Sequence, residues 1–212
     1  MRNEELLLAD IGNTHFHIFN GEKVEHLTYV DAMKKYREKE LLYITVKHKL
    51  TEQIEQIKNW KNISSLMKIK NEYDTMGVDR KALCLSHATG IFIDAGSAIT
   101  VDVMKNGIYQ GGYIFPGLKA MLNAYAGISS VLDVELNKDV SLEHLPTTTK
   151  DGISYGIIAS IKALIDQQSD GKKLYFTGGD GKLLSTFFKE ATYDEMLVFN
   201  GMQQALKDKK IC

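Results

Sequence analysis

Apolar residues recur along the chain in two patterns, short continuous runs and positions with helical spacing. Continuous runs at 41–46 and 174–177 are typical of buried strands. Apolar residues three and four positions apart predict helices over 51–60, from about 118 to 125, and over 153–165. The last of these helices has the clearest apolar face: Ile157, Ile158, Ile161, Leu164 and Ile165. Strands mixed with helices predict an α/β architecture in which helices cover the sheets.

One pattern occurs twice along the chain. Residues 6–19 and 91–104 each begin with an apolar run, continue with Asp-x-Gly and a small polar residue, and end as an alternating strand. Each copy then reaches an Asn-Gly pair, at 20–21 and at 106–107. Asn-Gly between alternating apolar residues strongly indicates a hairpin, because both turn positions need positive φ. The repetition predicts two related α/β lobes.

The length of the chain, 212 residues, suits one large domain or two small ones. Only two prolines occur and no Gly/Ser-rich linker interrupts the chain, so two lobes must be closely joined. We therefore expect an N-terminal lobe over residues 1–85 and a C-terminal lobe over residues 86–212. The 26 Lys and Arg residues nearly balance the 27 Asp and Glu residues. Without a bulk positive field, nucleic acid is a poor partner for this chain.

Cysteine usage and hydropathy indicate the compartment. Cys84 and Cys212 are too few for a disulfide framework and fit reducing surroundings, and Cys84 is expected to be buried among apolar neighbours. The apolar stretch near the N-terminus is too short for the core of a signal peptide, and no run is long enough to cross a membrane. We therefore expect a soluble, cytoplasmic protein without a membrane partner.

The repeated Asp-x-Gly turn suits the binding of phosphates. Its glycine allows close approach, and its backbone N–H groups form a concavity that binds anions. Two such turns facing one another across a cleft can hold a polyphosphate, and Asp10 and Asp94 can hold the accompanying metal ion. Alternatively these aspartates only cap turns, although two copies in register favour the site. Neither a P-loop nor a dinucleotide-binding fingerprint occurs.

Four motifs in order make the chain similar to a known family. The duplicated segment resembles the ATP-binding proteins of the acetate and sugar kinase/actin superfamily, and within it the chain resembles type III pantothenate kinase. The four motifs are Asp10-Ile11-Gly12-Asn13-Thr14, Gly77-Val78-Asp79-Arg80, Asp94-Ala95-Gly96-Ser97-Ala98-Ile99-Thr100 and Gly111-Gly112-Tyr113-Ile114-Phe115-Pro116-Gly117. The resemblance implies two actin-like (ribonuclease H-like) lobes, each a mixed sheet flanked by helices, with a cleft between them.

The resemblance also implies an activity. Members of that family use ATP to phosphorylate pantothenate to 4′-phosphopantothenate, at the first step of coenzyme A biosynthesis. They use Mg²⁺ and a monovalent cation, K⁺ or NH₄⁺, and work as homodimers. Two alternatives remain open: a kinase of the same fold for another small hydroxyl compound, and a non-catalytic regulatory relative, since fold does not fix function.

The resemblance implies roles for the segment around Asp79. Asp79 would be the general base that accepts the proton of a primary alcohol during phosphoryl transfer. Arg80, with its fixed fork of donors, would hold the substrate carboxylate together with Gly77 and Val78. Tyr73 would contact the substrate as well. Alternatively, Asp79 starts a helix and pairs with Arg80, and Tyr73 is a core residue.

The same resemblance implies further binding residues. Asp10 would orient Mg²⁺, directly or through water, together with the phosphates. Gly12, Asn13 and Thr14 would line the first phosphate-binding turn. Thr149 would bind substrate; alternatively, it belongs to the cap of the following helix.

In the second copy of the repeat, Asp94 would ligate the monovalent cation. Gly96 and Ser97 would contact ATP, with serine where the family usually has threonine. Gly178 and Gly179 would pack against the nucleotide, although a plain turn is an equally good interpretation.

Three other polar residues are weaker candidates. His15 and His17 alternate on one strand face, but without an evident third ligand they are better interpreted as partly exposed strand residues. Asp102, on the strand after the second turn, is left open between a functional and a structural role.

Overall fold

The computed structural model describes residues 6–12, 15–46 and 51–209 and divides into two compact units. Unit 1 comprises Met1–Ala88, Asn106–Tyr109 and Glu195–Cys212, and unit 2 comprises Thr89–Lys105 and Gln110–Asp194. The first boundary lies close to the expected one after residue 85. The C-terminal segment, expected in the second lobe, belongs to unit 1, because its helix packs against elements of that unit.

Unit 1 is built on a five-stranded mixed sheet. Its strands are β1 (Leu8–Ile11), β2 (Phe16–Phe19), β3 (Val24–Leu27), β4 (Leu41–Thr45) and β5 (Trp60–Asn62). They lie in the order β3-β2-β1-β4-β5; the pairs β1-β2 and β2-β3 are antiparallel, and β1-β4 and β4-β5 are parallel. The helix predicted over 51–60 ends at Glu55, and Trp60, expected in it, instead begins β5 and pairs with Leu41 of β4.

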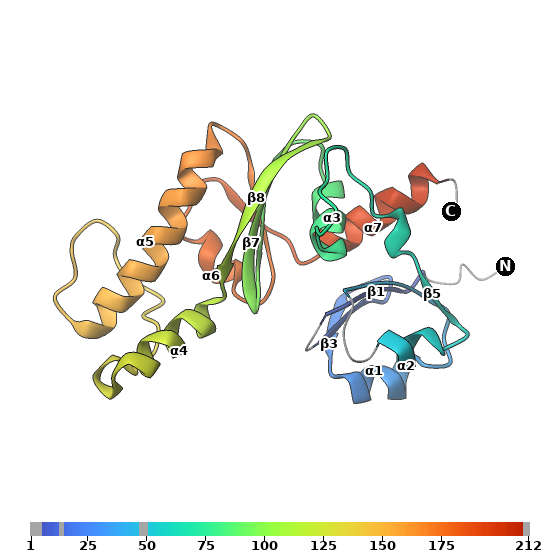
Figure 1. Ribbon diagram of the computed structural model, residues 1–212, viewed down its shortest axis with the longest axis horizontal. Coiled ribbons are helices and arrows are strands. Elements are labelled where there is room, and N and C mark those ends of the chain that lie inside the picture. Colours follow the sequence, from blue (N-terminus) through green and yellow to red (C-terminus); the bar gives the residue numbers. More distant parts are fainter. Residues whose placement is uncertain (1–5, 13–14, 47–50, 210–212) are drawn as a thin grey trace. The chain divides into compact units, whose positions relative to one another are not determined.

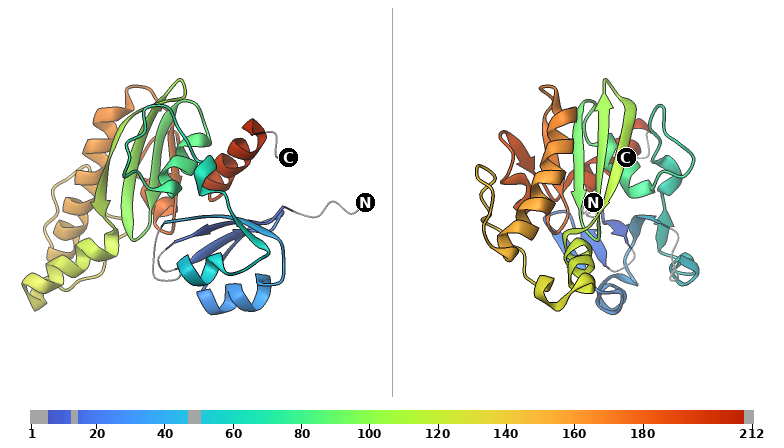
Figure 2. Two further views of the ribbon diagram at one scale, coloured as in Figure 1. Left: turned by 45° about the vertical axis from the view of Figure 1, so that its right-hand side comes forward. Right: turned by 60° about the vertical axis from the view of Figure 1, so that its left-hand side comes forward.

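Helices cover both faces of this sheet. They are α1 (Tyr29–Tyr36), α2 (Thr51–Glu55), α3 (Val78–Leu85) and α7 (Leu197–Asp208), and a 3-10 turn, η1, spans Ser64–Leu66. Figure 1 shows α1 and α2 on one face and α3 and α7 on the other. On the first face, Ile11, Phe16 and Ile18 of the sheet pack with Tyr36 of α1 and Ile54 of α2. On the second, α7 packs against α3 and β1, and Figure 2 shows the two helices side by side.

Unit 2 repeats the sheet of unit 1. Its strands are β6 (Gly90–Ala95), β7 (Ala98–Lys105), β8 (Ile108–Pro116), β9 (Leu174–Thr177) and β10 (Ala191–Tyr193). They lie in the order β10-β9-β6-β7-β8, so the first strand is again flanked by its antiparallel hairpin partner and by the parallel fourth strand. Because both sheets have this strand order, the predicted duplication is confirmed at the level of topology.

Helices of unit 2 pack on one face of its sheet (Figure 1). They are α4 (Leu118–Ile128), α5 (Thr149–Ser169) and α6 (Gly181–Ser185), with a 3-10 turn, η2, at Ser130–Leu132. Ile93 and Val101 of the sheet pack with Leu118 of α4 and with Ile157 and Ile161 of α5. In the part of the chain that the structure describes, no helix combines the length and hydropathy needed to cross a membrane.

The apolar face predicted for α5 is correct except at Leu164, which is 42% exposed. The buried arc of the helix includes Ser154, Ile161 and Ile165. Leu164 lies at the margin of that arc, and its side chain therefore remains accessible.

The two Asn-Gly pairs both join strands, but only one has the predicted turn. Asn106 and Gly107 have φ of 53° and 73°, as the two-residue turn between β7 and β8 requires. The loop between β2 and β3 is longer and only Gly21 of its pair has positive φ, at 96°. There the side chain of Asn20 accepts hydrogen bonds from the N–H groups of Glu22 and Lys23, and this contact organises a four-residue loop instead.

Candidate active site

Helix α3 begins at the motif 77–80. Gly77 is its N-cap, and Asp79 lies in the first turn, near the positive end of the helix dipole. A Cβ at 77 would meet Oδ1 of Asp79, so a larger residue at this position would displace the carboxylate. The same Oδ1 accepts a hydrogen bond from the backbone N–H of Arg80 at 2.8 Å. Asp79 is thus a helix-start residue whose carboxylate is held beside the end of the helix.

Arg80 lies inside unit 1 and joins two tyrosines. The residue is only 6% exposed. Its Nη1 donates to the hydroxyl of Tyr73 at 2.5 Å, and its Nη2 donates to the hydroxyl of Tyr109 at 3.3 Å. The guanidinium carbon also lies 5.8 Å from the centroid of the Tyr73 ring. Tyr73 is 42% exposed and is therefore not the core residue of the alternative interpretation.

The loop that carries Tyr73 is fixed to helix α3. Glu72 accepts hydrogen bonds from the backbone N–H of Ile69 at 2.8 Å and from Nζ of Lys81 at 2.9 Å. Burial opposes ionisation of this carboxyl, but the two hydrogen bonds prevail and hold the pKa of Glu72 below its ordinary value. The structure thus brings Tyr73, Asp79 and Arg80 together in one fixed region of unit 1.

Asp10 is the third residue of β1. Its two strand neighbours belong to the core of unit 1, so strand alternation puts Asp10 on the opposite face of the sheet. After the strand, the N–H of Gly12 donates to the carbonyl of His15 at 3.1 Å and closes the turn. Asn13 and Thr14, predicted to line this turn, lie outside the described residues.

The histidines beside this turn form a pair. Nδ1 of His17 on β2 and Nδ1 of His26 on β3 lie 2.6 Å apart, within hydrogen-bonding distance. Burial, followed by the charges of His26 and His15, lowers the pKa of His17 to about 4. Within residues 6–12, 15–46 and 51–209, no group of three His, Cys, Asp or Glu side chains could hold a metal ion.

Asp94 in unit 2 lies near the end of β6, between two threonines. It pairs with Thr100 of β7 and with Thr177 of β9, so the three side chains share one face of the sheet. Gly178 follows β9 with φ of 85°, and a Cβ at this position would collide with Oδ1 of Asp94. The loop after β9 therefore needs glycine, because its backbone lies directly against the carboxylate.

The two loops next to Asp94 are held by backbone hydrogen bonds. The N–H of Gly96 donates to a carbonyl of β7 at 2.9 Å, and this leaves Ser97 exposed in the loop between β6 and β7. The N–H of Asp180 donates to the carbonyl of Ala95 at 2.9 Å, so the turn at Gly178-Gly179 lies against the end of β6. Exposed backbone and a hydroxyl at such turns are suited to phosphate oxygens.

Sequence reasoning gave no role to the two threonines beside Asp94. Oγ1 of Thr100 is buried and has no hydrogen-bond partner among the described residues, and Thr177 is 5% exposed. The signal for Thr100 was its place in the hairpin, since six positions after Asp94 it lies directly opposite on β7. Asp102, the residue left open between two roles, is fully buried on the same strand, and Cys84 is buried as expected.

Thr149 is the first residue of α5 and is exposed. The helix is capped by its neighbour Thr148, whose side chain accepts a hydrogen bond from the N–H of Asp151 at 3.1 Å. The Thr148 hydroxyl also donates to Oδ2 of Asp151 at 2.8 Å. Capping is therefore done by Thr148, and it does not account for Thr149.

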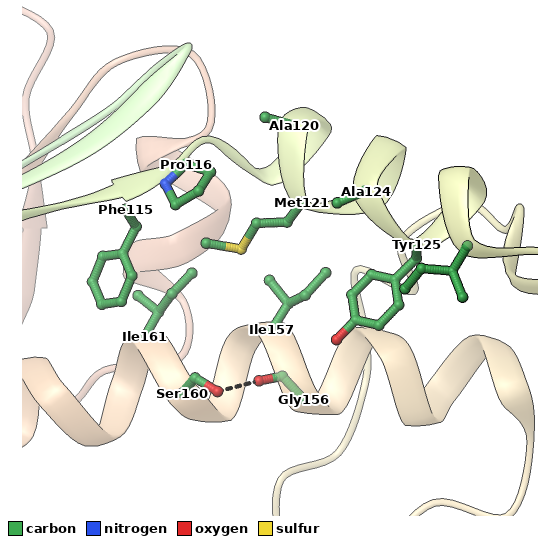
Figure 3. A pocket seen from close by; sticks show the side chains of 11 residues that line it. Phe115, Pro116, Ala120, Met121, Ala124, Tyr125, Gly156, Ile157, Ser160 and Ile161 are labelled. Atoms are coloured by element: carbon green, nitrogen blue, oxygen red, sulfur yellow. Dashed lines mark hydrogen bonds between the residues drawn. The ribbon is translucent and has the colours of Figure 1, made fainter.

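An apolar groove of about 500 Å³ lies between α4 and α5 (Figure 3). Met121 and Tyr125 of α4 line one side, and Ile157 and Ile161 of α5 line the other. Ile128, at the end of α4, also lines the groove and is 73% exposed. None of the residues expected in the active site lines this groove.

Comparison with known proteins gives one consistent family. Residues 53–170 match the family model described as type III pantothenate kinase. A type III pantothenate kinase from Helicobacter hepaticus is 41% identical over 203 residues, 95% of this chain and 98% of its own. Another, from Campylobacter jejuni, is 38% identical over 96% of this chain and 97% of its own.

Solved structures resemble the chain over nearly its whole length. A conserved Campylobacter jejuni protein, described as a Baf-family transcriptional activator, has a TM-score of 0.88 and 37% identity, with 98% of this chain and 100% of its own covered. A protein described as a 2-dehydro-3-deoxygalactonokinase from Sinorhizobium meliloti has a TM-score of 0.60 at 12% identity, with 96% of each chain covered. MreB 5 of Spiroplasma citri has 0.52 at 10% identity, covering 100% and 98%. The last two likenesses concern the fold alone, and they confirm the actin-like class.

Proposed function

Since the chain belongs to the type III pantothenate kinase family, we propose that it transfers the γ-phosphoryl group of ATP to the primary alcohol of pantothenate, with Asp79 as the general base. The product, 4′-phosphopantothenate, is the first intermediate of coenzyme A biosynthesis. The observation that supports this mechanism is the arrangement of Asp79, Arg80 and Tyr73 at the start of α3. The chain has only two cysteines, which agrees with a reducing compartment, and we place the reaction in the cytoplasm.

The chemical step needs little more than a base and fixed charges. As the alcohol oxygen forms a bond to the γ-phosphorus, the bond from that phosphorus to the leaving oxygen breaks and ADP departs. Asp79 accepts the alcohol proton and later returns it to solvent. The position of Asp79 in the first turn of α3 supports this role, because the hydrogen bond from the backbone N–H of Arg80 holds its carboxylate in place. Most of the catalysis then comes from positioning.

The substrate carboxylate is held by Arg80 and Tyr73 in this proposal. A guanidinium is a planar donor that matches a carboxylate. The phenol of Tyr73 lies at hydrogen-bond distance from the Arg80 guanidinium and so beside the same substrate group. Gly77 and Val78 place backbone close to the same region, at the start of α3. We assign Thr149 a further contact with the substrate, and its exposure at the start of α5 is compatible with that role.

ATP use follows from the kinase family, and the phosphate contacts are our proposal. In unit 1 the turn that starts with Asp10 and Gly12 would bind phosphate oxygens. In unit 2 the exposed loop at Gly96 and Ser97 and the turn at Gly178-Gly179 would do the same. We predicted from the sequence that the two turns face one another across a cleft, and this stays a prediction.

The residues present fit the two cations that the family implies. Mg²⁺ is commonly held by one or two carboxylates together with substrate phosphates and water, so the single carboxylate of Asp10 suffices. A monovalent cation needs oxygen ligands, and Asp94 offers a carboxylate beside the buried Oγ1 of Thr100, which has no hydrogen-bond partner within residues 6–12, 15–46 and 51–209. When bound, these cations would supply positive charge that offsets charge on the phosphates.

We further propose that the protein works as a homodimer and that the second copy covers the apolar surface of unit 2. That surface consists of the groove between α4 and α5 (Figure 3), which Ile128 helps to line, and of the exposed Val131 that follows α4. Contiguous exposed apolar residues are typical of protein interfaces.

The mechanism is tested by an assay that follows ADP release with pantothenate and ATP, with and without K⁺. Substitution of Asp79 by Asn removes the base and is expected to lower kcat by about 10² to 10⁴ fold. The matched control is Asp208→Asn, an exposed aspartate at the end of α7, which should retain wild-type kcat. Undiminished turnover by the Asp79 variant would contradict the assignment of the base.

A regulatory role is the second candidate, because the solved relative from Campylobacter jejuni is described as a transcriptional activator. The balance of charges argues against it, since a formal net charge of -1 offers no general attraction to DNA. Absence of turnover with pantothenate in the assay above, together with retained ATP binding, would favour this candidate or a kinase with another acceptor.

A further inference from the structure

We propose that Tyr109 is a positioning residue for the substrate carboxylate, acting through Arg80. This inference rests on the proposed function and adds to it a residue that sequence motifs do not mark. Tyr109 lies at the start of β8, two residues after Gly107, and belongs to unit 1 together with Tyr73 and Arg80. Tyr109 contacts the guanidinium although it lies 29 residues after Arg80 in the sequence.

Tyr109 is more deeply buried than Tyr73, and its backbone is held by two hydrogen bonds. The residue is 3% exposed, whereas Tyr73 is 42% exposed. Its backbone N–H donates to the carbonyl of Lys70 at 3.0 Å, and its carbonyl accepts from Nδ2 of Asn71 at 2.9 Å. Both main-chain groups of Tyr109 are thus tied to the loop that leads into Tyr73. The phenol of a residue held in this way has little freedom to move.

The contacts of Arg80 explain what this rigidity does. Its two terminal nitrogens donate to different phenols, Nη1 to Tyr73 and Nη2 to Tyr109. A planar group held at both nitrogens has a defined plane, and the rings of Tyr73 and Tyr109 lie 6.1 Å apart, centroid to centroid. Tyr109 therefore sets the plane of the guanidinium, and through it the direction in which the Tyr73 hydroxyl is presented.

A phenol suits this task better than a carboxylate would. It accepts a hydrogen bond from the guanidinium without adding a negative charge beside it, so Tyr109 does not compete with an anionic ligand. A free arginine side chain loses considerable rotamer freedom when it binds a ligand, and a side chain that is already oriented loses less. The expected benefit is tighter binding of an acidic substrate, with little effect on the transfer step itself.

The test is Tyr109→Phe, which retains the ring and removes only the accepting oxygen. We expect KM for pantothenate to rise about five- to tenfold while kcat changes less than twofold. The neutral primary amide of pantothenate, used as a second substrate, should show a KM that differs less than twofold between wild type and variant. Tyr36→Phe is the matched control, because Tyr36 is a buried tyrosine of unit 1 whose hydroxyl donates to Glu25, and its KM should stay unchanged.

A double-mutant cycle tests whether Tyr109 acts through Arg80. If it does, adding Tyr109→Phe to Arg80→Lys should raise KM less than twofold further, because the oriented guanidinium is already gone. A second variant, Asn71→Gly, keeps the positive φ of 70° at this position and removes the amide that holds the Tyr109 carbonyl. It should raise KM about two- to threefold, and it keeps the test available if Tyr109→Phe folds poorly.

The outcomes separate the inference from its premise. If wild type turns over pantothenate and both Tyr109→Phe and Asn71→Gly retain its KM, the positioning role is wrong and the proposed function stands. A full five- to tenfold additional rise on the Arg80→Lys background would likewise overturn it, since Tyr109 would then act independently. If wild type does not use pantothenate at all, the proposed function fails, and the inference fails with it.

Discussion

At the scale of single residues, removal of the Thr100 hydroxyl can either raise or lower the stability of the protein, depending on whether a cation is bound. A buried hydroxyl without a partner costs free energy, and a bound cation would recover that cost. Thr100→Val keeps the shape of the side chain and removes the oxygen. Without K⁺ the variant should be more stable than wild type by about 1 kcal/mol in urea unfolding. The K⁺-dependent gain in stability should be smaller in the variant; an equal gain in both proteins would exclude Thr100 as a ligand.

His17 predicts a dependence of stability on pH. Its pKa in the folded protein is about 4, below the ordinary value of 6.5, because burial and the neighbouring histidines disfavour the charged ring. Between these two values the unfolded chain binds a proton that the folded protein does not, so stability falls as the pH is lowered. The loss should reach about 2 kcal/mol between pH 7 and pH 4.5. His17→Gln should show a shallower fall in urea unfolding, and parallel curves would contradict this origin.

Some site residues could be identified from sequence motifs and others could not, and the two groups differ in how their contacts arise. Asp79 and Arg80 are adjacent, and their motif could be recognised directly. Tyr109 meets Arg80 only because Asn106–Tyr109 joins unit 1, and Thr100 meets Asp94 only through the register of a hairpin. Such contacts depend on tertiary structure, which periodicity does not encode.

At the scale of elements, helix α5 offers a test of capping. The side chain of Thr148 accepts from the N–H of Asp151, and loss of such a cap costs about 1 kcal/mol. Thr148→Ala should therefore lower the free energy of unfolding by about 1 kcal/mol. Thr147→Ala, an exposed threonine just before the cap, is the control and should stay within about 0.5 kcal/mol of wild type. Equal effects of the two would argue against the assigned cap.

Strands were easier to predict than the helices. Each of the hairpins β1-β2 and β6-β7 combines an apolar run with an alternating strand, and the Asp-x-Gly motif marks the turn between them. Helix α1 buries only Ala32 and Tyr36, too few apolar positions for a visible stripe. The helix expected over 51–60 stops at Glu55, because the apolar residue at 60 is needed in β5. The bounds of short helices such as α1 and α2 thus depend on their packing against the sheet.

At the scale of the whole molecule, the apolar surface of unit 2 predicts assembly. Light scattering should give about twice the 23.8 kDa of one chain. Ile128→Asp places a charge on the exposed end of α4 and should shift the mass toward one chain, because an interface does not tolerate an unpaired charge. Lys162→Ala, on α5 and paired with Asp166 at 2.7 Å, is a surface control that should retain the wild-type mass. A wild-type mass of one chain would contradict the homodimer.

Domain organisation was predictable in outline. The repeat indicated two lobes, and the equal strand orders of the two sheets agree with that interpretation. The assignment of the last helix was beyond the reach of the sequence. Helix α7 follows the strands of unit 2 in the chain, and only its packing on α3 and β1 shows where it belongs.

The return of α7 to unit 1 has a consequence for synthesis on the ribosome. Unit 2 is complete in sequence once Asp194 has been made, whereas unit 1 still lacks the helix that covers α3 and β1. A nascent polypeptide that stops before Leu197 therefore carries a finished second half and an open first half. The sheet of unit 1 is translated first, but it is the last to receive its full cover of helices.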